Sequence, residues 1–361
     1  MRIETKYWPA EQPRAGIEEA AAAIAAGGVV AFPTETVYGL GGDATSTEAV
    51  GRIFAAKGRP SDNPLIVHVA RSEDAAGLAA EVGAVEKALM SAFWPGPLTL
   101  VLPVREGAVS PLVTAGLDTV AVRVPAHELA RELIERAGCP VAAPSANRSG
   151  RPSPTLARHV LEDLDGRIDG VLDGGATGVG LESTVVRVVD GVVHILRPGG
   201  ITKDQLRRAA KGMADVAEDT ARTEGRPETG AQAEDASAPR SPGVKYAHYA
   251  PRGDMRIVTG EAGRLPPIVQ EQADQAAAAG RRVAVLSCSE HAAGYRAHAV
   301  FDWGSRAEPE KAAQALYATL RECDERGIDF IVAEGYPEDG IGEALMNRLR
   351  KAAGGREIPV R

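Results

Sequence analysis

The stretch that decides the fold is AFPTETVYGLGGDA (31–44), followed shortly by IFAAKGRPSDNPLIVHV (53–69). The apolar run VVAF (29–32) reads as a buried strand, and two threonines with a glutamate between them (34–36) come directly after it. In α/β folds, ligands bind beyond the ends of strands. The segment therefore predicts a polar site beside a buried sheet.

Two basic residues, Lys57 and Arg59, stand near the end of a helix that Thr45 and Glu48, at capping-box spacing, are predicted to open. One interpretation is that they only complement the helix dipole. That interpretation does not explain why they run directly into the turn SDNPL (61–65), which adds a hydroxyl and an amide. We interpret the group as triphosphate-binding, because a lysine offers a point charge and an arginine a planar fork.

Working outward, strand-like and helix-like patterns alternate over residues 1–208. Helices are predicted near 17–26, 127–138 and 202–211, the last opened by a capping box. Seven short runs are predicted strands: 29–32, 65–69, 98–103, 120–125, 139–144, 183–189 and 192–198. This alternation predicts an α/β domain with a mixed sheet.

The pattern stops after about residue 213, where a stretch without aromatic residues (213–240) predicts a flexible linker. SPGVKYAHYAP (241–251) differs, because it gathers two tyrosines, a histidine and a lysine. Strands and helices then alternate again, which predicts a second, smaller parallel α/β unit. We place the domain bounds at 1–208 and 256–361, with the linker at 209–255.

Composition limits the classes of function. The chain has 361 residues, 44% of them apolar, which is typical of a globular protein with two domains. The net charge of −8 argues against strong direct binding of nucleic acid, since phosphates need a basic surface. The cysteines, Cys139, Cys288 and Cys323, lie too far apart for a paired metal motif or a disulfide framework. No signal sequence or membrane-length apolar run is recognisable, so we expect a cytoplasmic protein.

Common nucleotide and hydrolase motifs are missing. The sequence contains no G-x-x-x-x-G-K-[ST], G-x-S-x-G or H-E-x-x-H. Gly39, Gly41 and Ala44 fit a loose dinucleotide pattern, but the matching acid, Asp62, sits in a turn before a strand. A Rossmann fingerprint needs that acid at the end of a strand, so nicotinamide binding is disfavoured.

Three further clusters of residues are polar, like the group around Lys57 and Arg59. Arg123 lies inside the apolar strand VAVRVP, while Ser183 and Arg197 stand at the ends of two other predicted strands. The loop PSANRSGRPSPT (144–155) adds hydroxyls, an amide and basic groups: Ser145, Asn147, Ser149, Arg151 and Ser153. Each cluster alone is weak evidence for a binding site, because turns also favour such residues. Together they predict a pocket for phosphates and carboxylates without a Walker loop.

The motifs PTETVYGL, KGRPSDNPL, WPGPLTLVL, VRVP, PSANRSG, STVV and RPGG, in this order, resemble the threonylcarbamoyl-AMP synthase family. The resemblance covers about residues 15–208, and SPGVKYAHYAP with NRLRKAA (347–353) resembles its two-domain branch. It implies a YrdC-like twisted mixed-sheet domain followed by a smaller Rossmann-like parallel α/β domain.

The resemblance also implies an activity, a nucleotidyl transfer. L-Threonine, bicarbonate and ATP would condense to threonylcarbamoyl-AMP and pyrophosphate, which supports modification of tRNA next to the anticodon. Mg²⁺ would accompany ATP, held through phosphates and waters with no protein side chain as ligand. Partner proteins that transfer the threonylcarbamoyl group to tRNA would act downstream.

Residue by residue, the resemblance implies one set of residues that binds L-threonine and another that binds ATP. L-Threonine would be bound by Thr36, His68, Arg123, the backbone of Ala143, and Ser183. ATP would be bound by Lys57, Arg59, Asn63, Thr119, Ser145, Ser153, Arg197, and Tyr246 or Tyr249. Lys57 and Arg59 would also stabilise the leaving pyrophosphate, and residues 241–251 would act as a lid. From the residues alone, a strand histidine with a satisfied hydrogen bond is the favoured interpretation of His68.

Two alternatives differ in testable features. A related carbamoyl-adenylate-forming maturation factor carries paired cysteines, which three isolated cysteines cannot supply. A non-catalytic RNA-binding module needs a basic face with exposed aromatic residues. An interaction-only role for residues 256–361 stays open, because no site motif was recognised there.

Overall fold

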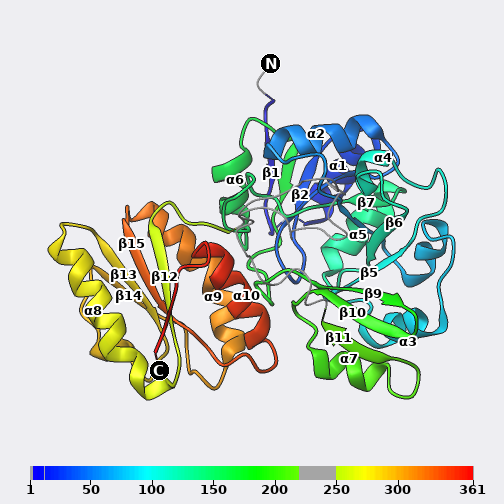
Figure 1. Ribbon diagram of the computed structural model, residues 1–361. Helices are drawn as coiled ribbons and strands as arrows, with labels where there is room; N and C mark the ends of the chain where they lie inside the picture. Colours follow the sequence, from blue (N-terminus) through cyan, green and yellow to red (C-terminus); the bar gives the residue numbers. More distant parts are fainter. Residues whose placement is uncertain (1–2, 12, 219–248, 361) are drawn as a thin grey trace, which may run out of the picture. The chain divides into compact units, whose positions relative to one another are not determined.

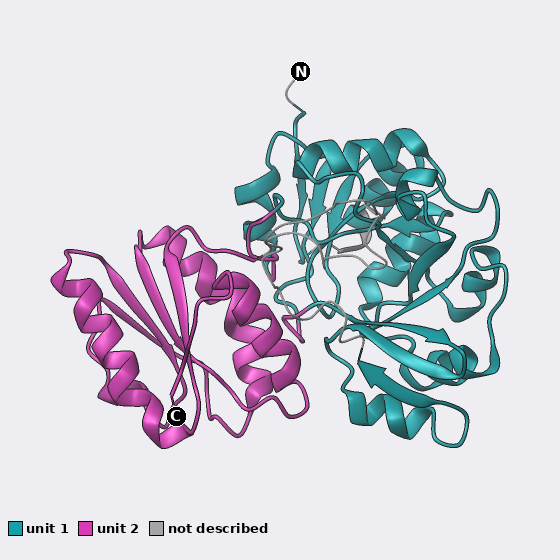
Figure 2. Cartoon of the chain, in the orientation of Figure 1, with its two compact units in different colours: residues 1–149, 156–177, 182–246 teal, residues 150–155, 178–181, 247–361 magenta. Residues whose placement is uncertain are grey.

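The computed structural model describes residues 3–11, 13–218 and 249–360, and these form two compact units (Figure 2). The first unit takes its described residues from 1–149, 156–177 and 182–246, and the second from 150–155, 178–181 and 247–361. Two short segments of the N-terminal half thus belong to the second unit, which the sequence did not indicate. The predicted domain bounds themselves stay a prediction.

The first unit is built on an 11-stranded sheet in the order β1-β8-β2-β3-β7-β4-β6-β5-β9-β10-β11 (Figure 1). Some neighbours, such as β4 and β6, are parallel and others, such as β5 and β6, are antiparallel, so the predicted mixed sheet is confirmed. The strands are β1 (Lys6–Trp8), β2 (Val30–Phe32), β3 (Gly39–Asp43), β4 (Ile66–His68), β5 (Leu98–Pro103), β6 (Thr119–Arg123), β7 (Val141–Ala142), β8 (Gly170–Leu172), β9 (Thr184–Val189), β10 (Val192–Arg197) and β11 (Asp215–Glu218).

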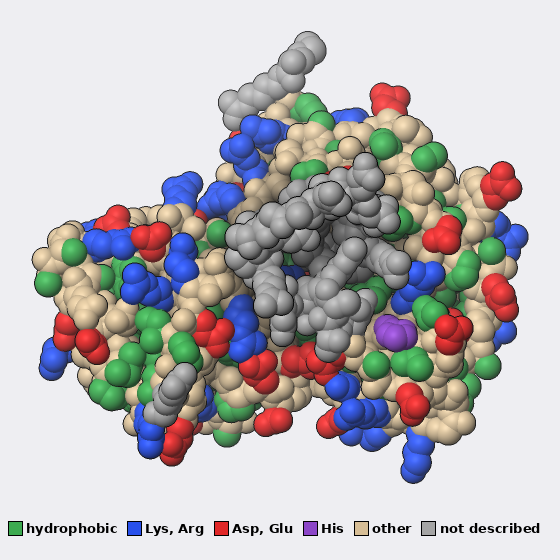
Figure 3. All heavy atoms as spheres, viewed as in Figure 1, with side chains coloured by type: hydrophobic (Ala, Val, Ile, Leu, Met, Phe, Trp, Pro, Cys, Tyr) green, Lys and Arg blue, Asp and Glu red, His purple; other side chains and the backbone are tan. Residues whose placement is uncertain are grey.

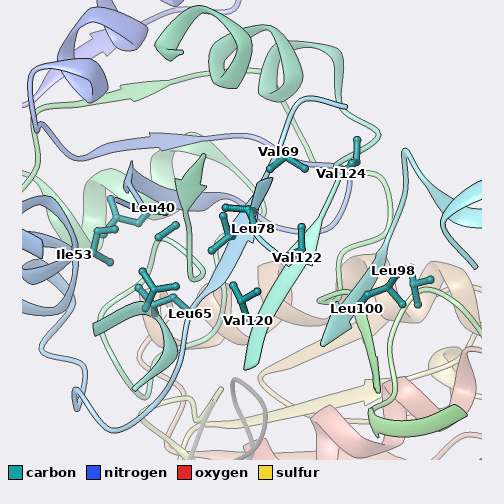
Figure 4. Close-up of a cluster of buried hydrophobic side chains, with 14 of the residues drawn as sticks. Leu40, Ile53, Leu65, Val69, Leu78, Leu98, Leu100, Val120, Val122 and Val124 are labelled. Carbon is teal, nitrogen blue, oxygen red and sulfur yellow. The ribbon is translucent and has the colours of Figure 1, made fainter. Parts of the chain in front are cut away.

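Helices pack on both faces of this sheet. They are α1 (Pro13–Ala25), α2 (Thr47–Lys57), α3 (Ala84–Phe93), α4 (Pro111–Thr114), α5 (Glu128–Ala137), α6 (Ala157–Leu164) and α7 (Lys203–Ala209), with a 3₁₀ turn at Ser72–Gly77. The larger core is formed by the strands with α2, α3, α4, α6 and α7, and Figure 4 shows part of it, including Leu40, Ile53 and Val122. A second core joins α1 and α5 to β2 and β7.

The start of α2 differs from the prediction. Ser46, not Thr45, is the N-cap, and its hydroxyl accepts a hydrogen bond from the backbone N–H of Ala49 at 3.2 Å. Thr45 instead donates to the carboxylate of Asp43, at 2.8 Å. The helix ends at Gly58, whose φ of +63° is a left-handed conformation that glycine adopts without strain.

At the end of the first unit, the structure confirms one prediction and corrects another. Thr202 and Gln205 form the predicted capping box of α7, each side chain bonding the other residue's backbone N–H. The structured part does not stop at about residue 213, however, because Asp215–Glu218 forms β11, parallel to β10. This strand has little apolar pattern of its own, and pairing with β10 satisfies its backbone.

The second unit is a five-stranded sheet in the order β14-β13-β15-β12-β16, with parallel pairing throughout. Its strands are β12 (Asp254–Thr259), β13 (Val283–Ser287), β14 (Ala299–Asp302), β15 (Phe330–Glu334) and β16 (Glu357–Pro359). Its helices are α8 (Leu265–Ala278), α9 (Pro309–Glu325) and α10 (Gly342–Ala352), with 3₁₀ turns at Ala262–Arg264 and Ala292–Gly294. Helix α8 covers one face and α9 and α10 the other (Figure 1), so the predicted Rossmann-like unit is confirmed.

The surface of each unit mixes both signs of charge. On the face that Figure 3 shows, Lys and Arg side chains are interspersed with Asp and Glu. Among the described helices, none is long and apolar enough to cross a membrane.

Candidate active site

The buried Arg123, at the end of β6, is the centre of the site. Its side chain is 4% exposed, and its guanidinium forms an ion pair with Glu35 at 2.6 Å. It also donates hydrogen bonds to the hydroxyl of Thr36, at 2.9 Å, and to the carbonyl of Gly96, at 3.2 Å. A buried cation needs a counter-charge and hydrogen-bond acceptors, and all three contacts supply them.

The turn after β2 carries Glu35, the counter-charge of Arg123. The hydroxyl of Thr34 lies 2.8 Å from that of Thr36 and donates to the carbonyl of Val37 at 2.7 Å. The backbone N–H groups of Thr36 and Val37 donate back to it. This local network fixes the turn, so Glu35 and Thr36 are held toward Arg123.

The motif WPGPLTLVL explains how three strands hold their side chains together. Gly96 accepts the bond from Arg123, and the next carbonyl, of Pro97, accepts from the backbone N–H of Thr184 at 2.9 Å. The hydroxyl of Thr99 lies 2.7 Å from that of Ser183. The start of β5 therefore ties the end of β6 to the start of β9.

Ser183, which was predicted to bind threonine, also contacts Arg197, which was predicted to bind ATP. Arg197 donates to the Ser183 carbonyl at 3.0 Å and to its hydroxyl at 3.1 Å. Gly199 allows this close approach, because a Cβ there would lie 2.4 Å from the backbone of Glu182 and Thr184. The structure thus brings one predicted threonine residue and one predicted ATP residue into contact.

Three residues of the predicted threonine set lie on one face of the sheet. His68 and Arg123 are register partners on parallel strands, and His68 is also paired with Val141, two residues before Ala143. Side chains two residues apart on a strand share a face. The register therefore brings His68, Arg123 and Ala143 to one side, with Thr36 bonded to Arg123. Ser183 joins them through Thr99.

His68 is buried, and its pKa is strongly perturbed. Burial, with a smaller contribution from the nearby Arg123 guanidinium, lowers the pKa of His68 to about 3, although backbone hydrogen bonds at Ile66 and Val141 act in the opposite direction. The ring also makes an edge contact with Phe32, with centroids 6.2 Å apart. His68 is therefore a neutral imidazole near neutral pH.

This shift predicts a pH effect on stability. Because the folded-state pKa lies below the ordinary value of ~6.5, the unfolded chain binds the proton more readily, and stability rises with pH between about 3 and 6.5. Acidification from pH 7 to pH 5 should cost about 2 kcal/mol of unfolding free energy through His68 alone. Denaturant titrations of the wild type and His68→Gln at both pH values measure it. His68→Gln should lose less unfolding free energy than the wild type between the two pH values. An equal loss would contradict the assignment of this pH effect to His68.

Lys57, at the end of α2, is buried and holds the loop after β7. Its Nζ donates to the carbonyls of Ser145 and Asn147, both at 2.5 Å. The hydroxyl of Ser145 donates in turn to the side-chain oxygen of Asn147, at 2.5 Å. The backbone N–H of Ser149 bonds the carbonyl of Lys57 at 2.9 Å. Lys57 thus lies beside the predicted ATP residue Ser145.

Arg59 and Asn63 occupy the next turn. Arg59 donates to the carbonyl of Asn63 at 3.4 Å and to that of Pro64 at 3.2 Å, while the Asn63 side chain is fully buried. Thr119 starts β6, four residues before Arg123 and on the same face, so about 13 Å separate them along the strand. The structure therefore places Thr119 at the opposite end of β6 from Arg123.

Two of the remaining predicted ATP residues lie in the second unit. Ser153 and Tyr249 belong to the second unit, where the Tyr249 ring packs against Tyr317 with centroids 5.2 Å apart and lies under Arg348. Tyr246 and residues 241–248 of the predicted lid lie outside the described residues. The roles of Ser153, Tyr246 and Tyr249 in ATP binding therefore stay predictions.

The donor chemistry of the first-unit site suits phosphates and carboxylates. Lys57, Arg59, Arg123 and Arg197 are cations, and the other predicted groups there are mainly hydroxyls and amides. Mg²⁺ prefers oxygen ligands and keeps several waters, so these residues fit it as an ion bound to ATP phosphates. That arrangement stays a prediction.

Three residues that hold the site were not assigned from sequence. Glu35 is the ion-pair partner of Arg123, Asn147 bonds Lys57 and Ser145, and Thr99 bonds Ser183. The glutamate and the asparagine stand inside motifs that were singled out, so their position was a usable signal. Thr99 alternates with leucines in a strand, and nothing local distinguishes it.

A mixed-sheet unit with buried cations and hydroxyls, followed in the chain by a smaller parallel α/β unit, has the chemistry of proteins that bind small anionic substrates. Residues 22–199 match the family described as "Telomere recombination", and residues 201–354 match "Threonylcarbamoyl-AMP synthase, C-terminal domain".

Individual relatives agree with these matches. A threonylcarbamoyl-AMP synthase of Bacillus subtilis is 50% identical over 351 residues, covering 95% of this chain and 94% of the relative. One of Pyrococcus abyssi is 44% identical, covering 95% and 96%. The crystal structure of P. abyssi Sua5 complexed with L-threonine matches with a TM-score of 0.88 and 43% identity over 100% of both chains. The chain belongs to the threonylcarbamoyl-AMP synthase family, as its motifs indicated.

Proposed function

We propose that this chain is an L-threonylcarbamoyladenylate synthase, which condenses L-threonine, bicarbonate and ATP into threonylcarbamoyl-AMP and pyrophosphate. The observation that carries the proposal is the buried Arg123, with Thr36, His68, Ala143 and Ser183 brought to the same region by strand register and hydrogen bonds. Membership of the family and a solved relative that contains L-threonine support it.

Arg123 would bind the threonine carboxylate, because its planar guanidinium can donate two parallel hydrogen bonds. Glu35 would then face the amine of threonine, since an amino acid carries its two charges on adjacent groups. A neutral His68 leaves Arg123 the dominant positive charge at this point. The amine, after losing a proton, would attack the carbon of bicarbonate, and loss of one water would give a carbamate.

The carbamate oxygen would attack the α-phosphorus of ATP, and pyrophosphate would leave. Here the protein aligns the groups and neutralises charge, as in other transfers at phosphorus. Lys57 would fix the loop that carries Ser145, while Arg59 and Arg197 would face the phosphates. Mg²⁺ on the phosphates would supply further neutralisation. A lid over the site would exclude water, which decomposes both the carbamate and the mixed anhydride.

The direct test is product formation. Purified chain with radiolabelled bicarbonate, L-threonine and ATP should yield a labelled adenylate and an equal amount of pyrophosphate. Reactions without threonine, or with threonine replaced by alanine, serve as controls. Failure of well-folded protein to form labelled product in the complete mixture would refute the proposal.

Transfer to tRNA is expected to need another protein, in the cytoplasm. The net charge of −8 opposes strong binding to a phosphate backbone. We therefore expect equal rates of ATP consumption with and without tRNA, and no modified tRNA from this chain alone. Chromatography of digested tRNA measures the second point; modified nucleoside in the single-protein mixture would contradict it.

A further inference from the structure

The second unit carries a polar cluster that none of the chemistry above uses. Cys288 directly follows β13, His291 stands three residues later, and Glu334 is the last residue of β15. The chain leaves β13 toward β14 at one edge of the sheet and leaves β15 for β16 at the other. In open α/β sheets, ligands bind in the crevice where the connections diverge in this way.

The three side chains have the spacing of metal ligands. Cys288 Sγ lies 3.6 Å from His291 Nδ1 and 3.8 Å from Glu334 Oε2, and the last two atoms are 2.8 Å apart. Zinc bonds of ~2.3 Å to sulfur and ~2.0–2.2 Å to nitrogen and oxygen put tetrahedral ligand atoms about 3.4–3.6 Å apart. Two separations nearly match, and the third needs an opening of about half an ångström.

The carboxylate of Glu334 is oriented for this purpose. The side chain is fully buried, and its Oε1 accepts hydrogen bonds from Ser287, at 2.6 Å, and from Tyr295, at 2.7 Å. The other oxygen, Oε2, is the one that faces Cys288 and His291. Second-sphere donors of this kind fix a ligating carboxylate in metal sites.

Tyr336 stands two residues after Glu334 in the chain. This tyrosine is 5% exposed, its hydroxyl has no hydrogen-bond partner among the described residues, and it interacts electrostatically with Cys288 and Glu334. A buried, unsatisfied hydroxyl costs free energy, so it indicates a missing partner. The His291 side chain is 18% exposed and gives the cluster access to solvent.

The competing interpretation is a structural ion network. Arg306 lies 3.7 Å from Glu334 Oε2, and with His291 it can neutralise the buried carboxylate without any metal. That network explains the charges. In it the Cys288 thiol makes a long hydrogen bond to Glu334, at 3.8 Å, and the Tyr336 hydroxyl is left without a partner among the described residues.

We propose that Cys288, His291 and Glu334 bind one zinc-class divalent cation, with a fourth position open to water or an exchangeable ligand beside Tyr336. Sulfur and imidazole ligands favour zinc over magnesium or calcium. Binding releases the thiol proton to solvent, as thiolate is the ligand form. Because only pairs of cysteines were considered in the sequence, this Cys-x-x-His pair with a distant glutamate was missed.

The test uses the full chain without an affinity tag, stripped with a chelator. Zinc affinity is measured by competition with a chromophoric chelator, and cobalt(II) serves as a spectroscopic probe of thiolate ligation. The variants are Cys288→Ser and His291→Ala. Cys323→Ser is the matched control, because Cys323 is also buried in the second unit but lies outside the cluster. Circular dichroism and thermal unfolding confirm that each variant is folded.

We expect one zinc per chain and a thiolate-to-cobalt charge-transfer band in the wild type and the control. Both ligand variants should bind zinc at least about 100-fold more weakly, since loss of a second-sphere partner alone costs roughly 10- to 100-fold. The band should vanish in Cys288→Ser. Absence of stoichiometric zinc in the wild type, or wild-type affinity in both ligand variants, would overturn the site and leave the ion network as the explanation.

Discussion

Arg123→Ala should lower kcat/KM for threonine by roughly 100- to 5,000-fold, the equivalent of the ~3–5 kcal/mol that loss of one partner of a buried ion pair costs. The guanidinium contacts Glu35, Thr36 and Gly96, so its removal takes the positive charge and its hydrogen bonds away from all three. Threonine-dependent release of pyrophosphate at several threonine concentrations measures the effect.

Because the alanine variant leaves Glu35 buried and unpaired, part of its loss can reflect weakened folding. Arg123→Lys separates the two effects, since it keeps the charge opposite Glu35 but loses the planar fork. It should fold, raise KM for threonine and leave KM for ATP nearly unchanged. Arg136→Ala, at an exposed ion pair on α5, is the control and should behave as wild type. Near-normal threonine use by Arg123→Ala would remove Arg123 from the site.

Lys57→Ala should have the second largest effect, on ATP. Lys57 donates to the carbonyls of Ser145 and Asn147, and each carbonyl left without a donor costs about 1–3 kcal/mol. The loop that carries Ser145 would loosen, and the charge near the phosphates would be lost. We expect weaker ATP binding by calorimetry, a turnover at least tenfold lower, and a lower thermal midpoint.

The ratio of the two substrate effects tests the role of Lys57. If Lys57 acts in ATP binding, Lys57→Ala should lower the affinity for ATP far more than the affinity for threonine. A purely structural role would weaken both affinities alike. Arg59→Ala should show the same bias with a smaller stability loss, because its carbonyl contacts are longer, at 3.2 and 3.4 Å. Lys203→Ala, at a surface ion pair with Glu218, is the matched control. Unchanged ATP affinity and turnover in both Lys57→Ala and Arg59→Ala would return these residues to the helix-dipole interpretation.

Local chemistry determined much of this protein. The short apolar runs predicted seven strands of the first unit but missed β1, β3, β8 and β11. The Thr202 capping box predicted the start of α7, because it depends on residues within a few positions of one another. The order of the motifs indicated the family. Where two local signals compete, the sequence was insufficient: Thr45 and Ser46 both suit an N-cap, and Asp43 decides by binding Thr45.

Only the tertiary structure decided which side chains meet. Arg123 bonds a threonine 87 residues away, and Lys57 bonds carbonyls 88 and 90 residues away. Cys288 and Glu334 approach each other across 46 residues. Such pairs follow from strand order and register, which long-range packing sets and no local pattern encodes. The sequence alone therefore determined many of the elements, the family and most of the residue types of the site. The sheet decided which groups would neutralise one another and where a second, metal-like cluster would form.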